Sequence, residues 1–229
     1  MTALDYLSQN PLLHMGMIVP IKRGTAHILY VAGDGVCLIE TKSGAHMLSV
    51  ASIEVGRSLL AQLPSEGLFT FHQSFMLDDF KKKVRYATLL ENYQAAYLSK
   101  DPLPVSCNIE IKPLEINHFD VIMDVYGVDV GEDYLKKRLE DGELFGGFAN
   151  AELVGFIGIH AEGSIGMLEV FGRHRKKGYG TALTSYAVNH QLAKGIIPFE
   201  QIGVDNAASM AVAQKLGFSV STEKVYWLF

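Results

Sequence analysis

Residues 170–181, with the sequence VFGRHRKKGYGT, constrain the fold of this chain more than any other stretch. An apolar run with strand character precedes them, and a run with apolar residues at helical spacing follows them. Glycine stands at positions 178 and 180, directly after three basic residues. A strand, a glycine-containing loop and a helix in series predict an α/β fold in which this helix begins next to the end of a strand.

The same junction predicts an anion-binding site. Free backbone N–H groups and the helix dipole favour a negative group at a helix start, and glycine allows a close backbone approach. Two familiar phosphate loops do not fit. A dinucleotide fingerprint needs a third glycine, and Tyr179 stands where a Walker loop has lysine. A basic turn capped by glycines, without a ligand, is the remaining alternative.

Composition narrows the class of protein. The chain has 229 residues, 48% of them hydrophobic, so it can bury a sizeable core. The net charge of −5 argues against broad binding of nucleic acid. Residues 1–106 carry nine basic and nine acidic residues, so the acidic excess lies in the second half. The cluster of four basic residues at positions 173–177 therefore stands out in an acidic domain.

The remaining global features predict a cytoplasmic protein without a metal. Cys37 and Cys107 form no disulfide framework or zinc pattern, and no two histidines lie at helical-turn spacing. No apolar run approaches the roughly 18 residues of a membrane span. Asp5 stands where a signal peptide would carry a basic residue.

Two prolines in the segment 99–106, Pro102 and Pro104, predict a boundary between domains at 1–104 and 105–229. In the first domain, Asp34-Gly35 predicts a hairpin turn and Ser52 predicts the cap of a helix that runs through Gln62. Residues 75–98 fit either a helix or a strand. The second domain reads as a short strand, a helical stretch at residues 116–127 and a charged helix at residues 131–143. Two strands joined at residues 150–151 follow, and then strand, helix, strand, helix and strand.

A second motif follows the first at a fixed distance. Residues 204–218, VDNAASMAVAQKLGF, begin after a predicted strand, with Asn206 and Ser209 at the start of a helix. The pattern Arg175-x-x-Gly178-x-Gly180 followed by this segment resembles the two signatures of the GNAT superfamily of N-acetyltransferases. The resemblance covers roughly residues 107–229. The Ile-Pro-Phe run before Val204 is also similar to the glycine N-acyltransferase-like branch.

The resemblance implies a fold and a donor. The fold would be a mixed, mostly antiparallel sheet flanked by helices, preceded by a smaller α/β domain that is a degenerate copy of it. The donor would be acetyl-CoA, with its pantetheine arm along the backbone of Leu168 and Val170. The pyrophosphate would bind at Arg175, Lys176, Lys177, Gly178, Tyr179, Gly180 and Thr181. Asn206 and Ser209 would reach the pantetheine, and Asn206 also suits a helix cap.

The chain departs from the family pattern at two positions. Gly172 stands where a proline is common, and Ala213 stands where many members have a tyrosine that protonates the departing thiolate. Tyr226 and Tyr179 are the candidate substitutes for that acid.

An amine with a pKa near 10 must lose a proton before it attacks, so the reaction needs a base. Glu169, on the strand beside the expected thioester, is the first candidate. Strand alternation leaves open whether it faces a cleft or solvent. His160 and Glu162 are weaker candidates.

The sequence thus predicts a two-domain N-acetyltransferase that moves acetyl from acetyl-CoA to a primary amine of a small molecule or peptide by direct attack. The first domain would wall one side of the acceptor cleft, and the acidic second half favours a cationic acceptor. Neither nucleic acid nor a membrane is expected as a partner, and the chain would be a monomer or homodimer. Two alternatives stay open: a longer-chain acyl-CoA acyltransferase, and an acyl-CoA-binding sensor or scaffold without turnover.

Overall fold

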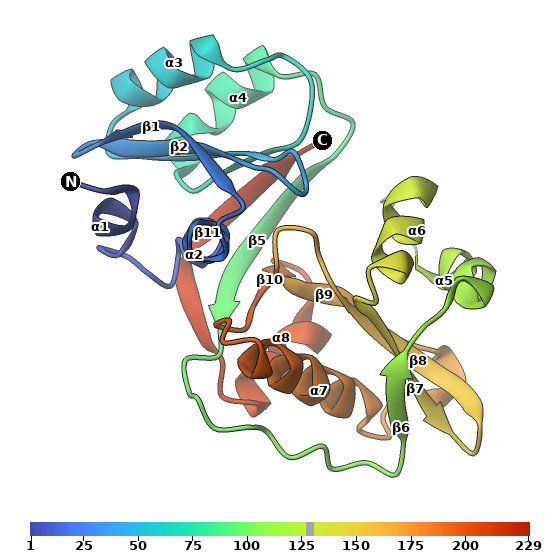
Figure 1. Ribbon diagram of the computed structural model, residues 1–229. Helices are drawn as coiled ribbons and strands as arrows, with labels where there is room; N and C mark the ends of the chain where they lie inside the picture. Colours follow the sequence, from blue (N-terminus) through green and yellow to red (C-terminus); the bar gives the residue numbers. More distant parts are fainter. Residues whose placement is uncertain (127–130) are drawn as a thin grey trace. The chain divides into compact units, whose positions relative to one another are not determined.

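A computed structural model describes residues 1–126 and 131–229 and divides the chain into two compact units (Figure 1). The first unit contains Met1–Ala96, Gln201–Met210 and Ser219–Phe229, and the second contains Tyr97–Glu200 and Ala211–Phe218. The C-terminal strand therefore groups with the N-terminal residues rather than with the segment that precedes it. The domain boundary that the sequence places at residues 104 and 105 stays a prediction.

The first unit is a mixed sheet in which the last strand of the chain lies between two earlier ones. Its strand order is β1-β2-β3-β4-β11-β5, antiparallel except between β3 and β4. The strands are β1 (Ala26–Ala32), β2 (Gly35–Glu40), β3 (His46–Val50), β4 (Phe69–Phe71), β5 (Leu89–Ala96) and β11 (Ser219–Leu228).

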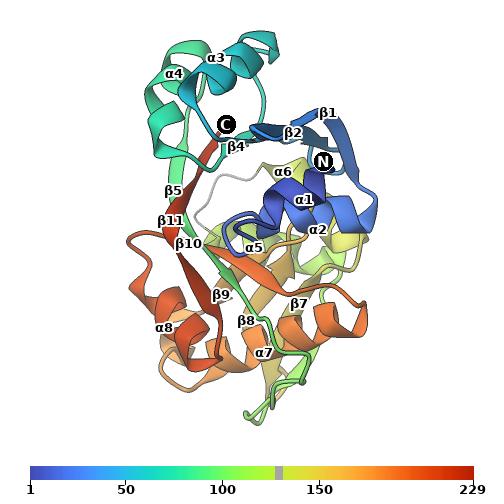
Figure 2. The ribbon, with the colours of Figure 1, turned by 90° about the vertical axis from the view of Figure 1, so that its left-hand side faces the viewer.

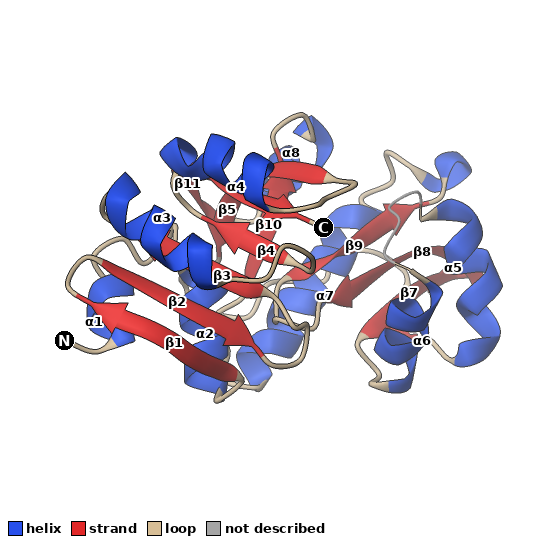
Figure 3. Ribbon diagram, turned by 90° about the horizontal axis from the view of Figure 1, so that it is seen from above, coloured by secondary structure: helices blue, strands red, loops and turns tan. Residues whose placement is uncertain are grey.

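Helices cover both faces of this sheet (Figures 1 and 3). They are α1 (Ala3–Leu7) and α2 (Met15–Arg23) on one face, and α3 (Ile53–Gln62), η1 (Ser74–Met76) and α4 (Leu77–Lys83) on the other. Strand β11 serves both cores because its side chains alternate. Tyr226 and Leu228 pack in the core under α3 and α4, whereas Val225 and Trp227 pack in the core with α1 and α2.

Local sequence signals in this unit are confirmed. Ser52 caps α3 by accepting a hydrogen bond from the N–H of Val55, and the helix ends at Gln62 as predicted. The predicted hairpin joins β1 and β2, with residues 33–34 as its turn and Gly35 already in β2. The ambiguous segment 75–98 contains both structures, since α4 is followed by β5.

The second unit has the antiparallel strand order β6-β7-β8-β9, and β10 joins β9 in parallel at Glu200 opposite Ile165. Its strands are β6 (Glu110–Pro113), β7 (Leu144–Ala149), β8 (Glu152–Ile159), β9 (Ile165–Val170) and β10 (Phe199–Gly203), the last of which runs on into the first unit. Its helices are η2 (Ile116–His118), α5 (Phe119–Val125), α6 (Glu132–Glu140), η3 (Gly172–His174) and α7 (Tyr179–Ala193). Helix α8 (Ala207–Lys215) has residues in both units.

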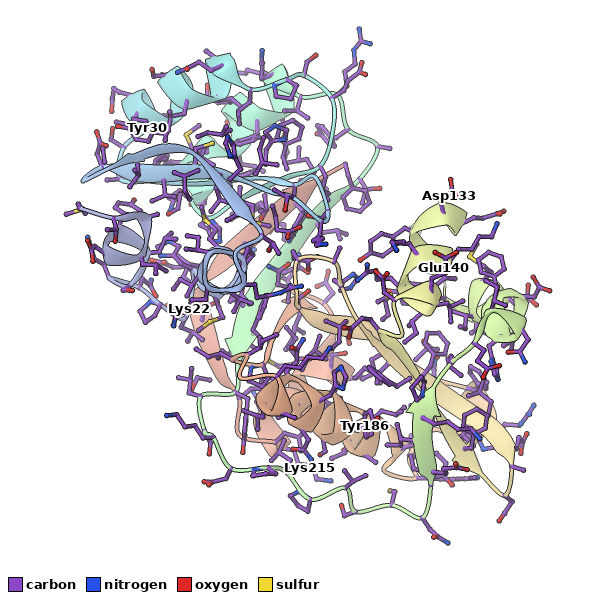
Figure 4. All side chains as sticks on the ribbon, viewed as in Figure 1. Lys22, Tyr30, Asp133, Glu140, Tyr186 and Lys215 are labelled. Atoms are coloured by element: carbon purple, nitrogen blue, oxygen red, sulfur yellow. The ribbon has the colours of Figure 1, made fainter. Side chains whose placement is uncertain are left out.

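Helix α7 lies on one face of β7–β9, and α5 and α6 lie on the other (Figures 1 and 2). Tyr186 of α7, labelled in Figure 4, contacts Phe145 of β7 with ring centroids 5.2 Å apart. On the opposite face, Ile122 of α5 and Leu135 of α6 share a core with Phe156 of β8. The mixed, mostly antiparallel sheet flanked by helices confirms the predicted fold class.

No helix within residues 1–126 and 131–229 has the length and apolar character that a membrane crossing requires.

Candidate functional site

The predicted site begins at a bulge in strand β9. Met167 has a φ of 51°, a backbone conformation that residues with a Cβ rarely adopt, and the register between β8 and β9 shifts between Phe156 and Gly158. A bulge bends its strand and re-aims the residues that follow. Here those residues are Leu168, Glu169 and Val170, all half-buried.

Glu169 faces the side of the sheet that α5 and α6 cover. Its antiparallel partner on β8 is Phe156, which belongs to the core formed with those helices. Residues paired across antiparallel strands share a face, so Glu169 points away from α7. Its side chain is 25% exposed, so the carboxylate is accessible to a substrate.

The loop after β9 has a strained backbone that leads directly into α7. Lys176 has a φ of 63° and Gly178 a φ of 84°, both in the left-handed region. Gly178 is the N-cap of α7, and no side chain caps this helix. The N–H groups of the first turn, at Tyr179, Gly180 and Thr181, are therefore left for solvent or a ligand.

The two glycines of the loop meet different requirements. A Cβ at Gly178 would be strained by the positive φ and would lie 3.1 Å from Sγ of Cys107. A Cβ at Gly180 would meet only Cγ2 of Val170, at an ordinary 3.7 Å. Backbone conformation and packing thus require glycine at position 178. Neither requires glycine at position 180, where the missing side chain leaves open space at the start of α7.

The basic residues of the loop divide into paired and unpaired cations. Arg173 forms an ion pair with Glu152. Arg175 donates from Nη2 to Oε1 of Glu169 at 2.9 Å and from Nε to the carbonyl of Val170 at 3.0 Å. Lys176 and Lys177 are exposed and form no ion pair with any residue in the described part of the chain. These two lysines are therefore available to bind an anion without first breaking an ion pair.

The candidate proton donors lie in different surroundings. Ala213 is fully buried, so the family's usual tyrosine position faces the protein interior here. Tyr226 is 5% exposed and stacks on Phe71 with ring centroids 5.1 Å apart, and burial raises its pKa. Tyr179, at the start of α7, is half-buried, and its ring centroid lies 6.4 Å from the ring centroid of His174. The acid role of Tyr226 stays a prediction, and the structure gives its ring a packing role.

Asn206 is a helix cap, as its sequence position suggested. Its Oδ1 accepts a hydrogen bond from the N–H of Ser209 at 3.0 Å, at the start of α8. This contact leaves the Asn206 amide nitrogen for a ligand. Asn206 and Ser209 belong to the first unit and the α7 loop to the second, so their shared role in donor binding rests on the motif alone.

The two weaker base candidates are held by neighbouring side chains. Nδ1 of His160 lies 2.8 Å from the hydroxyl of Tyr134, and the His160 ring occupies the space where a Cβ of Gly166 would be. Glu162 is buried and accepts a hydrogen bond from the hydroxyl of Ser164. Both side chains are thus held by contacts within the protein, so Glu169 remains the first candidate for the catalytic base.

Tyr126 is a residue of this face that the sequence did not single out. Burial, and after it the charge of Glu169, raises the pKa of its phenol to about 12. Its ring meets Phe156 edge to face, with centroids 6.1 Å apart. Residues 116–127 read only as a helical stretch in the sequence, so no local signal marked Tyr126.

The described residues contain no group of three or more His, Cys, Asp or Glu side chains that could hold a metal ion.

Comparison with known proteins gives one family-model match and several solved structures of similar fold. Residues 144–228 match the model of the FR47-like protein family, a span that includes the α7 loop and Asn206. A solved Drosophila protein is similar over 99% of this chain and 94% of its own, with a TM-score of 0.69 and 14% identity. A comparison with curated proteins gives no match.

Two further solved structures carry acetyltransferase names. One is a GNAT-family acetyltransferase from Colwellia psychrerythraea, with a TM-score of 0.54, 14% identity and coverage of 100% of this chain and 98% of that one. The other is a GCN5-related N-acetyltransferase from Kribbella flavida, with a TM-score of 0.54, 12% identity and coverage of 95% and 94%.

Residues 144–228 are thus similar to the FR47-like protein family, and the chain has the fold of the GNAT superfamily of N-acetyltransferases, as its two motifs predicted. The glycine N-acyltransferase-like branch stays a prediction, because none of these matches singles it out.

Proposed function

We propose that this protein is an acyl-CoA-dependent N-acyltransferase that moves acetyl from acetyl-CoA to a primary amine. One observation carries the proposal: an uncapped helix start follows the bulged end of β9, with two unpaired lysines and an unexplained glycine beside it. This is the arrangement that a pyrophosphate needs. The GNAT fold supports an acyl-CoA as the molecule that carries it.

The loop and the strand end would hold different parts of the donor. The N–H groups of residues 179–181 would donate to the pyrophosphate, and Lys176 and Lys177 would add charge-assisted contacts. The backbone of Leu168 and Val170 would pair with the amides of the pantetheine arm. The Val170 carbonyl already accepts a hydrogen bond from Nε of Arg175. For this carbonyl to pair fully with a pantetheine amide, the Arg175 guanidinium would have to turn away from it.

The proposed chemistry is a direct acyl transfer. The neutral amine nitrogen attacks the thioester carbon, Glu169 accepts the proton that the amine loses, and the C–S bond breaks. The products are an amide and the CoA thiolate, which takes up a proton to become the thiol. Tyr226 or Tyr179 would supply that proton by the sequence interpretation, and solvent can also supply it. An ammonium group must first lose a proton, so the rate should rise with pH.

One observation favours a second candidate function. The buried Ala213 gives the chain no tyrosine acid at the usual position, which fits a CoA-binding sensor or scaffold without turnover. A longer-chain acyl-CoA as donor also stays a possible alternative. The monomeric or dimeric state and the cytoplasmic location stay predictions from the sequence.

Calorimetric titration with acetyl-CoA, CoA and octanoyl-CoA tests the donor. We expect saturable binding that weakens about tenfold or more when both Lys176 and Lys177 are changed to Gln, because two charge-assisted contacts are lost. Changing the exposed lysines Lys81 and Lys82 to Gln is the matched control. Binding of none of the three ligands would overturn the proposal.

Thiol release with a mixture of primary amines then separates an enzyme from a sensor. Continuous release of CoA that depends on the amine supports turnover. Tight binding of the donor with no release above the rate of hydrolysis supports the sensor. The order of the three affinities in the titration, for acetyl-CoA, CoA and octanoyl-CoA, separates an acetyl donor from a longer acyl donor.

A further inference from the structure

Strand β1 forms the outer edge of the first unit's sheet, with β2 as its neighbour on the inner side (Figure 3). Within the described residues, no backbone–backbone hydrogen bond joins Ala26–Ala32 to any part of the chain other than β2. The free side of an edge strand carries N–H and C=O groups with which another strand can pair. Water or a further strand must therefore satisfy these groups of β1.

The sequence of β1 carries no charge or proline that would keep another strand away. Natural edge strands are protected by charged side chains, by proline or by being very short. The seven residues of β1, AHILYVA, include no Lys, Arg, Asp, Glu or Pro. Three of them are large apolar residues with high exposed fractions, Ile28 at 36%, Leu29 at 45% and Val31 at 41%. The free edge is therefore long and apolar.

The outer strand of the second unit, β6, has the protection that β1 lacks. It has only four residues, and Glu110, Lys112 and Pro113 are three of them. Glu110 and Lys112 are exposed, with Oε1 and Nζ 3.6 Å apart. Charge, proline and short length thus all disfavour pairing at β6. The contrast indicates that β1 is an edge at which pairing is tolerated.

The pairing of β1 with β2 determines which side chains of β1 share a face. Ile28 lies opposite Leu38 and Val31 lies opposite Val36, and both of these partners belong to the core with α1 and α2. Residues paired across antiparallel strands share a face, so Ile28 and Val31 point to the same side of the sheet although they are three positions apart. A bulge causes this spacing, because Leu29 has no partner on β2.

A second copy of β1 fits this edge when Ile28 lies opposite Val31 of the second copy. Two identical strands pair antiparallel about a two-fold axis perpendicular to the sheet, so each contact occurs twice and every pair must share a face. Ile28 and Val31 meet this condition, and each copy then covers the exposed apolar side chains of the other. A shift of one residue would oppose side chains that point to different faces.

The charges beyond the two ends of β1 also favour a second copy. Lys22 and Arg23 end the helix before the strand, and Asp34 lies in the turn that follows it. Lys22, labelled in Figure 4, and Asp34 form no ion pair within the described part of the chain. Antiparallel pairing brings the basic end of each copy towards the acidic end of the other, so the charges are complementary.

We infer that β1 is a dimer interface, at which two copies of this chain pair antiparallel through Ala26–Ala32 with Ile28 opposite Val31 of the second copy. The inference does not depend on the proposed function. One strand per copy is a small interface, so the dimer should be in concentration-dependent equilibrium with the monomer. The contact is isologous and occupies the edge of both copies, so the assembly closes at two chains.

Sedimentation velocity of the full chain over a concentration series measures this equilibrium. We expect a monomer at low concentration and a dimer at high concentration, without larger species. Val31→Lys places a charge within the paired edge, so the dissociation constant of the dimer should rise about tenfold or more. The matched control is Ile116→Lys, at an apolar position of η2 that is 58% exposed, and it should leave the constant unchanged. Thermal unfolding checks that both variants are folded.

Mixed cysteine variants test the register without adding a charge. When Ile28→Cys and Val31→Cys are mixed with oxidised glutathione, we expect a disulfide between the two proteins, because these positions would face each other. Each variant alone should form no more covalent dimer than the unmodified protein, in which Cys37 is buried and Cys107 is half-buried.

Three results would overturn the inference. The first is a monomer at every concentration, which would leave a strand of another protein as the occupant of this edge. The second is a dimer that Val31→Lys does not weaken, or that Ile116→Lys weakens equally, because it would form through another surface. The third is as much covalent dimer from Ile28→Cys alone as from the mixture, because identical residues would then lie opposite each other.

Discussion

The guanidinium of Arg175 contacts the carboxylate of Glu169, with Nη2 and Oε1 2.9 Å apart. A residue of the predicted anion-binding loop therefore holds the side chain that we propose as the base. A pyrophosphate would compete for the same guanidinium, so donor binding and proton acceptance are coupled through this pair.

The first prediction concerns Arg175. In Arg175→Gln we expect the affinity for acetyl-CoA to fall about tenfold, since hydrogen bonds to charged groups contribute about 1.5–3 kcal/mol. The free energy of unfolding should change by less than about 1 kcal/mol, because the Arg175 side chain is 64% exposed to solvent. Titration calorimetry and urea denaturation measure the two effects. An equal loss of affinity in Arg173→Gln would show that the loop acts only through its total charge.

The second prediction separates the two glycines. Gly178→Ala should destabilise the fold by about 1–2 kcal/mol, because its φ of 84° suits only glycine. Gly180→Ala should leave thermal unfolding almost unchanged, because its Cβ meets only an ordinary contact. It should nevertheless weaken acetyl-CoA binding roughly tenfold by filling the space at the helix start. Unaltered binding in a well-folded Gly180→Ala would argue that no ligand approaches there.

The third prediction tests the base. Glu169→Gln keeps a hydrogen-bond acceptor for Arg175 but cannot take a proton at neutral pH. We expect kcat to fall about 10²- to 10⁴-fold, with the dissociation constant of acetyl-CoA changed by less than about threefold. The rate should also gain a steeper dependence on hydroxide or added buffer base. The control is Glu152→Gln, at the carboxylate that pairs with Arg173. A comparable loss of kcat in both variants would contradict the assignment.

The fourth prediction concerns acid stability. Burial lowers the pKa of His72 from its ordinary 6.5 to about 3, so the folded protein keeps this ring neutral where the unfolded chain protonates it. Its contribution to stability is full above pH 6.5 and is lost as the pH falls towards 3, at up to about 1.4 kcal/mol per pH unit.

In His72→Asn the amide can still donate to the Leu48 carbonyl, which His72 contacts through Nδ1. We expect the free energy of unfolding to fall less steeply between pH 6.5 and 4 than in the unmodified protein, as urea denaturation would show. His27→Asn, at an exposed strand position, should keep the original slope. Parallel slopes for all three proteins would show that His72 titrates normally in the folded state.

The sequence predicted those features that depend on neighbouring residues. The Ser52 cap, the Asn206 cap, the turn at residues 150–151 and the glycine start of α7 each depend on a few adjacent positions. The fold class followed from the order of these elements, and the comparisons confirm it.

What the sequence did not predict depends on residues that are distant along the chain. The pairing of β11 with β5 joins Trp227 to Leu90, and it moves the end of the chain into the first unit. A pocket lined by residues 89–92 and 203–206 exists because the turn after β10 meets the start of β5. The face of Glu169 was undecided because strand alternation gives two sides, and only its partner Phe156 identifies which one is covered.

The position of β11 between β4 and β5 has a consequence during synthesis. Both neighbours leave the ribosome more than a hundred residues before it, yet β5 pairs with β11 along most of its length, and two hydrophobic cores need Val225, Tyr226, Trp227 and Leu228. The N-terminal unit therefore cannot complete its folding until β11, more than a hundred residues after β5, has left the ribosome. Until the last strand emerges, the nascent chain carries two open sheet edges and an unfinished interior, which chaperones would have to shield.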